Sequence, residues 1–410
     1  MWISRILRLR ASEVVVLSSV ASIKRHQRLV NLKSSRLLSS SSLATSGTKM
    51  AAAQMQLKDP DPRFVEVCRM MSPDDANFHG NVHGGVILKM IEQAGVIIST
   101  RHCNSQRESE GEEAHVPCYT ALVRVERTDF LQPMFIGEVA QLHAEITHTA
   151  HHSLEVQVKV WAENIMKGTK RLTNRATLWY LPMAVDPPHK IQTVPKMTYI
   201  NKETEEAGWS RYRAQKADRE RKGLGGAPSL DLSMLERMRE SQENGLMEHT
   251  VAYAQSSLIH LAGVSDCNAV NYVYGGVTMK FMDEVAGITA AKYCKTNVVT
   301  ASMDTVNFHK PIKRGSVMYF TGRPTFTSAH SMEIEVFVDT EALREGITKK
   351  ERAVHAFFTF VSLSQPERKV LPIPCLQVQT DGEASRFFEG KMRYCNAKRK
   401  RIFSEGSSVD

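Results

Sequence analysis

PDDANFHGNVHGGVILKMIE, residues 73–92, is matched by VSDCNAVNYVYGGVTMKFMD, residues 264–283, at a constant offset of 191 residues. Both stretches keep an asparagine, a pair of glycines and an acid at the same spacing. These positions are Asn77, Gly84, Gly85 and Glu92 in the first copy, and Asn268, Gly275, Gly276 and Asp283 in the second. One structural unit therefore occurs twice in this chain.

A buried helix is predicted directly after each glycine pair. In the first copy Val86, Ile87, Met90, Ile91 and Ala94 recur at i, i+3 or i+4, the period of one helix face. Two glycines at the start of a helix allow the backbone to approach a ligand closely. The first turn also offers unpaired N–H groups and the positive end of the helix dipole, so we expect it to hold an anion or a polarised carbonyl oxygen.

The acid follows the second glycine by seven residues, inside an otherwise apolar helix. A charge is costly to bury there without a partner or a purpose. Seven residues place the acid roughly 10 Å along its own helix from the glycine amides. It can reach a carbonyl held by such amides only if the two helices pack antiparallel. We therefore predict two composite sites, one of Asn77, Gly84 and Gly85 facing Asp283, and one of Asn268, Gly275 and Gly276 facing Glu92.

Charge and cysteine usage exclude several classes of protein. The net charge of +9 is concentrated in residues 1–50, which hold nine Lys and Arg and one acid, so the remaining chain is almost neutral. A nucleic-acid-binding domain concentrates basic residues on its folded part, so we expect no nucleic-acid partner. Seven cysteines without a CxxC pair argue against a disulfide framework or a zinc site and favour a reducing compartment. No apolar run is long enough for stable membrane insertion.

Residues 1–50 are rich in Arg and Ser, poor in acids and amphipathic at their start. Such a leader is typical of a mitochondrial transit peptide, and a disordered basic tail is the alternative. A form that starts near Met50 would remain cytoplasmic.

Strand-like alternation follows each predicted helix. Four period-two stretches are predicted in each half: 121–130, 138–149, 153–164 and 175–182, then 300–308, 316–326, 331–339 and 354–364. We therefore expect an α+β protein in which an antiparallel sheet wraps a long helix, twice. The predicted domains are 63–185 and 249–366, separated by a charged linker at 186–248 with a solvated helix, and followed by a basic tail at 367–410. The histidines at 143, 148, 151 and 152 are expected to be exposed rather than to form a metal site.

The repeated unit resembles the tandem-hotdog acyl-CoA thioesterases. The resemblance rests on PDDAN (73–77), GNVHGGVILKMIE (80–92), GGVTMKFMDEVAGI (275–288) and FTSAHSMEIEV (326–336), and it covers roughly residues 63–395. It implies two hotdog domains that form an intrachain pseudo-dimer, hydrolysis of long-chain fatty acyl-CoA to fatty acid and CoA, and no cofactor. It also implies a homo-oligomer, a trimer of tandem chains.

The resemblance further implies that Asn77 and Asp283 are the catalytic pair. Asp283 would activate a water or attack the thioester directly, and Asn77 would orient the water or the carbonyl. A second site with Asn268 and Glu92 stays open, although Tyr274 replaces His83 in that copy. His83 is expected to be a supporting residue. A hotdog hydratase or dehydratase and a non-catalytic acyl-CoA-binding scaffold remain the alternatives.

Overall fold

The computed structural model describes residues 64–77, 79–105, 116–186, 190–223, 247–343 and 350–406, which all belong to one compact unit, Pro60–Asp410. The predicted leader, residues 1–50, lies outside the described residues.

Each half consists of one long helix and six strands. In the first half these are β1 (Phe64–Met70), α2 (Gly84–Ser105), β2 (Cys118–Val125), β3 (Thr128–Phe130), β4 (Val139–Thr149), β5 (Leu154–Asn164) and β6 (Thr169–Ala184). In the second half they are β7 (Ser256–Leu261), α6 (Gly275–Cys294), β8 (Asn297–Met303), β9 (Val306–Phe308), β10 (Ser316–Thr327), β11 (Met332–Ala342) and β12 (Glu351–Leu363). The α+β tandem-hotdog prediction is confirmed.

The strands of the two halves form one continuous antiparallel sheet. Its twelve described strands run in the order β1-β4-β5-β6-β2-β9-β12-β11-β10-β7, and β3 and β8 form a second link between the halves. The halves meet where Arg124 of β2 pairs with Asn307 of β9 and where Thr128 of β3 pairs with Met303 of β8. The core lies between the sheet and the two long helices, and the side chains of β4 alternate between this core and the outer face.

The prediction of four strands per half was incomplete. The stretch 121–130 forms two strands, because the chain breaks between β2 and β3 at Glu126 and Arg127. The edge strands β1 and β7 were not predicted. Exposed positions of both strands carry apolar residues, Phe64 and Met70 in β1 and Ile259 and Leu261 in β7, so apolar and polar residues do not separate onto two faces.

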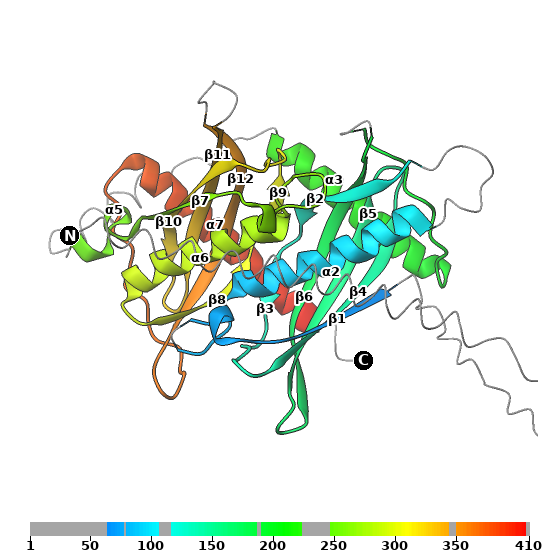
Figure 1. Ribbon diagram of the computed structural model, residues 1–410. Coiled ribbons are helices and arrows are strands. Elements are labelled where there is room, and N and C mark those ends of the chain that lie inside the picture. Colours follow the sequence, from blue (N-terminus) through cyan, green and yellow to red (C-terminus); the bar gives the residue numbers. More distant parts are fainter. Residues whose placement is uncertain are drawn as a thin grey trace, which may run out of the picture. The chain divides into compact units, whose positions relative to one another are not determined.

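Helices α2 and α6 pack antiparallel in front of the sheet (Figure 1). The glycine pairs permit this close crossing. A Cβ atom on Gly85 would lie 2.7 Å from the Cα atom of Lys280, and one on Gly276 would lie 2.8 Å from that of Lys89. Each glycine thus faces the helix of the other half, three residues before that helix's acid.

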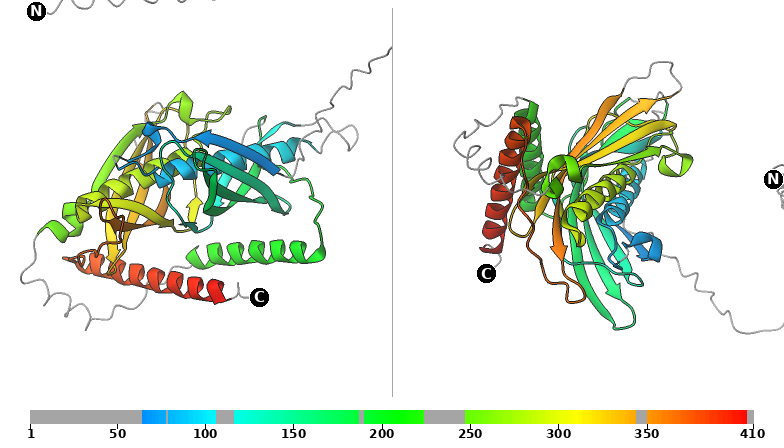
Figure 2. Two further views of the ribbon diagram at one scale, coloured as in Figure 1. Left: turned by 90° about the horizontal axis from the view of Figure 1, so that it is seen from below. Right: turned by 90° about the vertical axis from the view of Figure 1, so that its left-hand side faces the viewer.

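Helix α3 (Lys202–Gly223) and helix α7 (Asp381–Gly406) lie on the opposite face of the sheet from α2 and α6 (Figure 2). The helix predicted in the linker is present, but one of its faces is packed rather than solvated. Arg211 forms an ion pair with the buried Glu155, and Trp209 packs on His148. His148 is fully buried under α3, so its predicted exposure was wrong.

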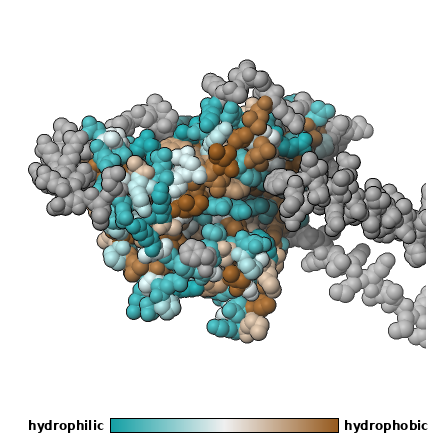
Figure 3. Space-filling model, turned by 60° about the vertical axis from the view of Figure 1, so that its left-hand side comes forward, coloured by the Kyte–Doolittle hydropathy of each residue, from teal (hydrophilic) through white to brown (hydrophobic). Residues whose placement is uncertain are grey.

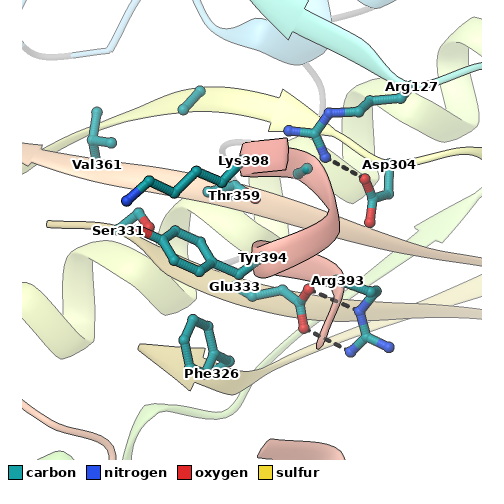
Figure 4. A pocket seen from close by; sticks show the side chains of 12 residues that line it. Arg127, Asp304, Phe326, Ser331, Glu333, Thr359, Val361, Arg393, Tyr394 and Lys398 are labelled. Carbon is teal, nitrogen blue, oxygen red and sulfur yellow. Dashed lines mark hydrogen bonds and ion pairs between the residues drawn. The ribbon is translucent and has the colours of Figure 1, made fainter. Parts of the chain in front are cut away.

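Helix α7 takes up most of the basic tail predicted at 367–410. Its buried residues Ala384 and Phe387 pack on the sheet, and Arg386 and Arg393 pair with the buried carboxylates of Glu335 and Glu333. Figure 4 shows the Arg393–Glu333 pair at the edge of a cavity of about 260 Å³ beneath this helix. The basic residues of α7 therefore bind acids of the outer sheet face.

Candidate active site

The carboxylate of Asp283 is held by groups from both halves of the chain. The backbone N–H of Gly85, in the first turn of α2, donates to Oδ2 at 2.7 Å. The hydroxyl of Thr300, on β8, donates to Oδ1 at 2.7 Å. The antiparallel helix crossing thus places the acid of α6 at the start of α2.

Burial raises the pKa of Asp283, which is only 2% exposed. The hydrogen bonds from Thr300 and from the Gly85 amide oppose this rise, as does the nearby His83, because each favours the charged carboxylate. A carboxylate with a raised pKa is a stronger base than an exposed one. The environment of Asp283 therefore suits a group that accepts a proton.

The two amides that were expected to hold a carbonyl oxygen have different roles. The N–H of Gly85 is bound to Asp283 and is not available for a substrate. The N–H of Gly84 has no hydrogen-bond acceptor in the part of the chain that the structure describes, and Gly84 lines a cavity. A Cβ atom on Gly84 would lie 2.8 Å from the hydroxyl oxygen of Thr300, so glycine is required for this close approach. Of the two amides, that of Gly84 is the one that can donate to a ligand in the cavity.

Asn77 lies in the loop before α2, and its side chain is fixed by that loop. Its Oδ1 accepts hydrogen bonds from the backbone amides of His79 and Asn81. This leaves its Nδ2 group to point across the halves toward Oδ1 of Asn297, at 3.4 Å. Asn77 therefore presents a donor to the other half of the chain.

Asn77, His83, Gly84, Asp283 and Thr300 all line one cavity of about 700 Å³. The cavity lies between the loop before α2, helix α6 and strand β8. Three residues of the first predicted composite site, Asn77, Gly84 and Asp283, thus line one cavity shared by both halves, and the fourth, Gly85, binds Asp283.

The second predicted composite site has the same backbone arrangement. The acid Glu92 is buried and accepts hydrogen bonds from the backbone amides of Gly276 and Gly275. Asn268 uses its Oδ1 as Asn77 does, accepting from Val270 and Tyr272. Burial raises the pKa of Glu92 to about 8, the glycine amides notwithstanding. Burial therefore favours the neutral form of Glu92, as it does for Asp283.

Side chains around the second site differ from those of the first. Strands β2 and β8 correspond at an offset of 178 residues, so Leu122 takes the place of Thr300 and Tyr119 that of Asn297. The Leu122 side chain would lie 2.6 Å from a Cβ atom on Gly275. Glu92 consequently receives no hydroxyl hydrogen bond, and its Oε2 has no partner among the described residues. Tyr274 occupies the N-cap position where the first half has His83.

Comparison with known proteins supports the pairing of two similar halves. A family model described as thioesterase superfamily matches residues 79–169 and 270–347. The chain is 55% identical to the cytosolic acyl coenzyme A thioester hydrolase of Rattus norvegicus over 345 residues, 82% of this chain and 84% of the relative. The chain belongs to the acyl coenzyme A thioester hydrolase family.

One further relative and one solved structure are also similar to this chain. The cytosolic acyl coenzyme A thioester hydrolase of Homo sapiens is 55% identical over 81% of this chain and 83% of its own length. A solved acyl-CoA hydrolase from Staphylococcus aureus, in complex with butyryl coenzyme A, coenzyme A and coenzyme A disulfide, is 28% identical, with a TM-score of 0.36, over 38% of this chain and 94% of its own.

Sequence reasoning missed two polar residues of this family member's cavity, Thr300 and Asn297. Both lie on β8. The sequence predicts a strand there from the alternation of its residues and assigns no site residue to it. A signal was present, because the matched residues of the first half, Leu122 and Tyr119, are not polar in the same way. A polar residue in one copy of a repeated apolar strand indicates a site that only this copy forms.

Two further observations concern metal ions and membranes. The described residues contain no group of three or more His, Cys, Asp or Glu side chains that could hold a metal ion. Among the described helices, none combines the length and the apolar composition that crossing a membrane requires.

Proposed function

We propose that this protein hydrolyses long-chain fatty acyl-CoA thioesters to fatty acid and CoA, and that Asp283 and Asn77 carry the reaction. The observation that supports this most is the hydrogen bond from the Gly85 amide to Asp283. It joins an acid of the second half to the helix start of the first, beside a cavity of about 700 Å³.

In the proposed reaction the thioester carbonyl lies at the start of α2. The free amide of Gly84 donates to its oxygen, and the Nδ2 group of Asn77 orients the carbonyl or the attacking water. Asp283 either takes a proton from that water or attacks the carbonyl carbon itself. The C–S bond breaks, the CoA sulfur takes up a proton, and water supplies the new oxygen of the fatty acid. His83 supports the charge of Asp283 from the cavity wall.

The second composite site is proposed to be inactive in hydrolysis. Glu92 lacks the hydroxyl hydrogen bond that favours the charged form of Asp283, because the apolar Leu122 stands where the first site has Thr300. Gly275 and Gly276 then serve the helix crossing rather than a substrate.

The reaction class is tested by product analysis. The purified protein is incubated with palmitoyl-CoA, and free thiol and palmitate are quantified together. Hydrolysis predicts equal amounts of both. A hydratase acting on the matching enoyl-CoA would add water without releasing thiol, and a binding scaffold would retain palmitoyl-CoA unchanged. Either result would reject the proposed activity.

We propose a homo-oligomer, a trimer of tandem chains, as the assembly. The edge strand β7 presents Ile259 and Leu261 at 67% and 58% exposure, and Val264 follows at 74%. Apolar side chains also gather on the face of the molecule drawn in Figure 3. Light scattering coupled to size exclusion tests the assembly, and a monomeric mass would contradict it.

The compartment depends on the start of the chain. We propose a mitochondrial form when residues 1–50 act as a transit peptide and a cytoplasmic form for a chain starting near Met50. The relatives are named cytosolic. Fluorescent fusions of the full chain and of a Met50 start would distinguish the two, and identical cytoplasmic signals would reject a role for the leader.

A further inference from the structure

The cavity extends beyond the carboxylate along helix α6. Gly287, Ile288 and Ala291 follow Asp283 on one side of that helix and line the cavity together with Val298 of β8 and Phe360 of β12. Eight residues of helix from Asp283 to Ala291 cover roughly 12 Å. This part of the lining is apolar.

Polar side chains line the same cavity. They include Asn77, Asn81, Gln132 and Arg368, whose guanidinium lies 4.2 Å from the ring centre of Phe135. Arg368 forms no ion pair with any described residue. The lining therefore combines an apolar row along α6 with polar groups, as an acyl-CoA combines an apolar chain with a polar carrier.

The corresponding space in the first half is closed by side chains. At the helix offset of 191, Ala291 corresponds to Thr100, and at the strand offset of 178, Val298 corresponds to Thr120. The hydroxyl oxygens of Thr100 and Thr120 are hydrogen bonded at 2.8 Å, and Ser99 adds a second bond to Thr120 at 2.6 Å. These bonds tie helix α2 to strand β2 across the space that is open between α6 and β8.

Gly287 adds to the difference between the halves. Its counterpart in α2 is Val96, which packs against the core. A Cβ atom on Gly287 would meet only the ring of Phe360, at 3.8 Å, which is ordinary contact. Glycine is therefore not required here by a close helix approach, and its effect is to leave space.

We propose that Gly287, Ala291 and Val298 are specificity-determining residues, which keep a groove along α6 open for the acyl chain and thereby set the acyl length that the enzyme accepts. This inference rests on the proposed thioesterase function. The polar side chains of the lining, among them Arg368, take the CoA part, which all substrates share. Each methylene buried in the groove raises kcat/KM by about fourfold, until the chain reaches the end of the groove.

The test places the threonines of the first half at the matched positions of the second half. The double variant Ala291→Thr, Val298→Thr introduces the threonine pair that closes the space beside α2. We measure kcat and KM with butyryl-, octanoyl- and palmitoyl-CoA in the full chain. The expected result is unchanged kcat/KM for butyryl-CoA and a loss of tenfold or more for palmitoyl-CoA, so that the preference moves to shorter chains.

A matched control opens the other half. Thr100→Ala, Thr120→Val removes the same pair from the first half, where no substrate is proposed to bind, and the chain-length profile is expected to stay as in wild type. Gly287→Val is the second groove variant, because it inserts the residue of the first half at a position with room for a Cβ. Both groove variants are first checked for an unchanged melting temperature. If the double variant is unstable, the result for Gly287→Val tests the inference in its place.

Two results would overturn the inference. An equal loss for all three substrates would place the CoA part in this groove, and an unchanged profile in Gly287→Val would place the acyl chain elsewhere. Neither depends on the catalytic assignment, because Asp283→Asn tests that separately. If Asp283→Asn retained thiol release, the proposed mechanism would fail while the chain-length profile still tested the groove.

Discussion

Thr300 is the residue that distinguishes the two copies of the carboxylate site. Its hydroxyl donates to Asp283, whereas the matched Leu122 offers nothing to Glu92. A hydrogen bond to a charged group contributes about 1.5–3 kcal/mol. Its presence keeps Asp283 closer to the charged state that a base requires, despite complete burial.

Replacing Thr300 by Val, which has the same shape, removes this hydrogen bond. The pKa of Asp283 should rise further, so Asp283 should become protonated at a higher pH than in the wild type. We expect kcat to drop roughly tenfold to a hundredfold at neutral pH and the acid limb of the pH–rate profile to move upward. Thr300→Ser should restore both. A profile that keeps its midpoint in Thr300→Val would show that the hydroxyl does not act on Asp283.

Glu92 should make the stability of the protein depend on pH. Burial raises its pKa to about 8 in the folded state, from an ordinary value of 4.5 for glutamate. Between these values the folded chain binds a proton that the unfolded chain has released, so the free energy of unfolding falls as pH rises from about 4.5 to about 8. Glu92→Gln keeps an oxygen acceptor for the glycine amides but cannot ionise.

We therefore expect Glu92→Gln to melt close to wild type near pH 5 and several degrees higher than wild type at pH 8. Thermal unfolding at a series of pH values measures this. If the two proteins lost stability in parallel with rising pH, Glu92 would not be the group responsible.

At the scale of elements, the crossing of α2 and α6 decides whether the site exists. Gly85→Ala would place a Cβ atom 2.7 Å from the Lys280 backbone and force the helices apart. We expect a loss of about 1–3 kcal/mol in the free energy of unfolding together with a loss of activity. Gly287→Ala is the matched control on α6, since its Cβ meets Phe360 at 3.8 Å, and it should be neutral or stabilising. Equal stability losses in both would contradict this account of the crossing.

Helix α7 is held to the sheet by the pair of Arg393 with Glu333. Glu333 is 6% exposed, so Arg393→Ala leaves a buried carboxylate without its cation, at a cost of about 3–5 kcal/mol. Adding Glu333→Gln removes that charge and should recover part of the loss, because the side chain still accepts from Thr325. Denaturant unfolding of both variants measures the recovery. A double variant no more stable than Arg393→Ala would contradict a charge-based role.

The elements that the sequence predicts well are those with a repeated pattern. The long helices, most strands and their two-fold use follow from the 191-residue and 178-residue offsets. The edge strands β1 and β7 were missed because they carry apolar residues on their exposed faces as well, which hides the alternation in the sequence. The contact of α3 with Glu155 and His148 was missed because a charged helix looks the same in sequence whether or not one face is packed.

The candidate site, like the fold, was predicted only in part. Helix geometry alone places the acid of one half against the glycines of the other, as in the Gly85–Asp283 contact. It does not distinguish the roles of Gly84 and Gly85, because that depends on which amide the carboxylate itself occupies. The parts played by Thr300 and Asn297 depend on how strand β8 lies beside α6, which one sequence does not specify.

At the scale of the whole molecule, duplication has produced two sites of unequal chemistry in one continuous sheet. The first has a partly open cavity, a hydrogen-bonded carboxylate and the paired amides of Asn77 and Asn297. The second retains the backbone geometry but carries Leu122, Tyr119 and a carboxyl without a hydroxyl hydrogen bond. We infer that one copy performs catalysis while the other stabilises the helix crossing.

The most direct measurement of this claim is the rate of CoA release from palmitoyl-CoA by four single variants of the full chain. Asn77→Ala and Asp283→Asn alter the first site, and Asn268→Ala and Glu92→Gln alter the second. The account predicts that Asp283→Asn lowers kcat by about 10²-fold or more, that Asn77→Ala also impairs turnover, and that both second-site variants retain near wild-type rates. Loss of activity in Glu92→Gln with retention in Asp283→Asn would contradict it.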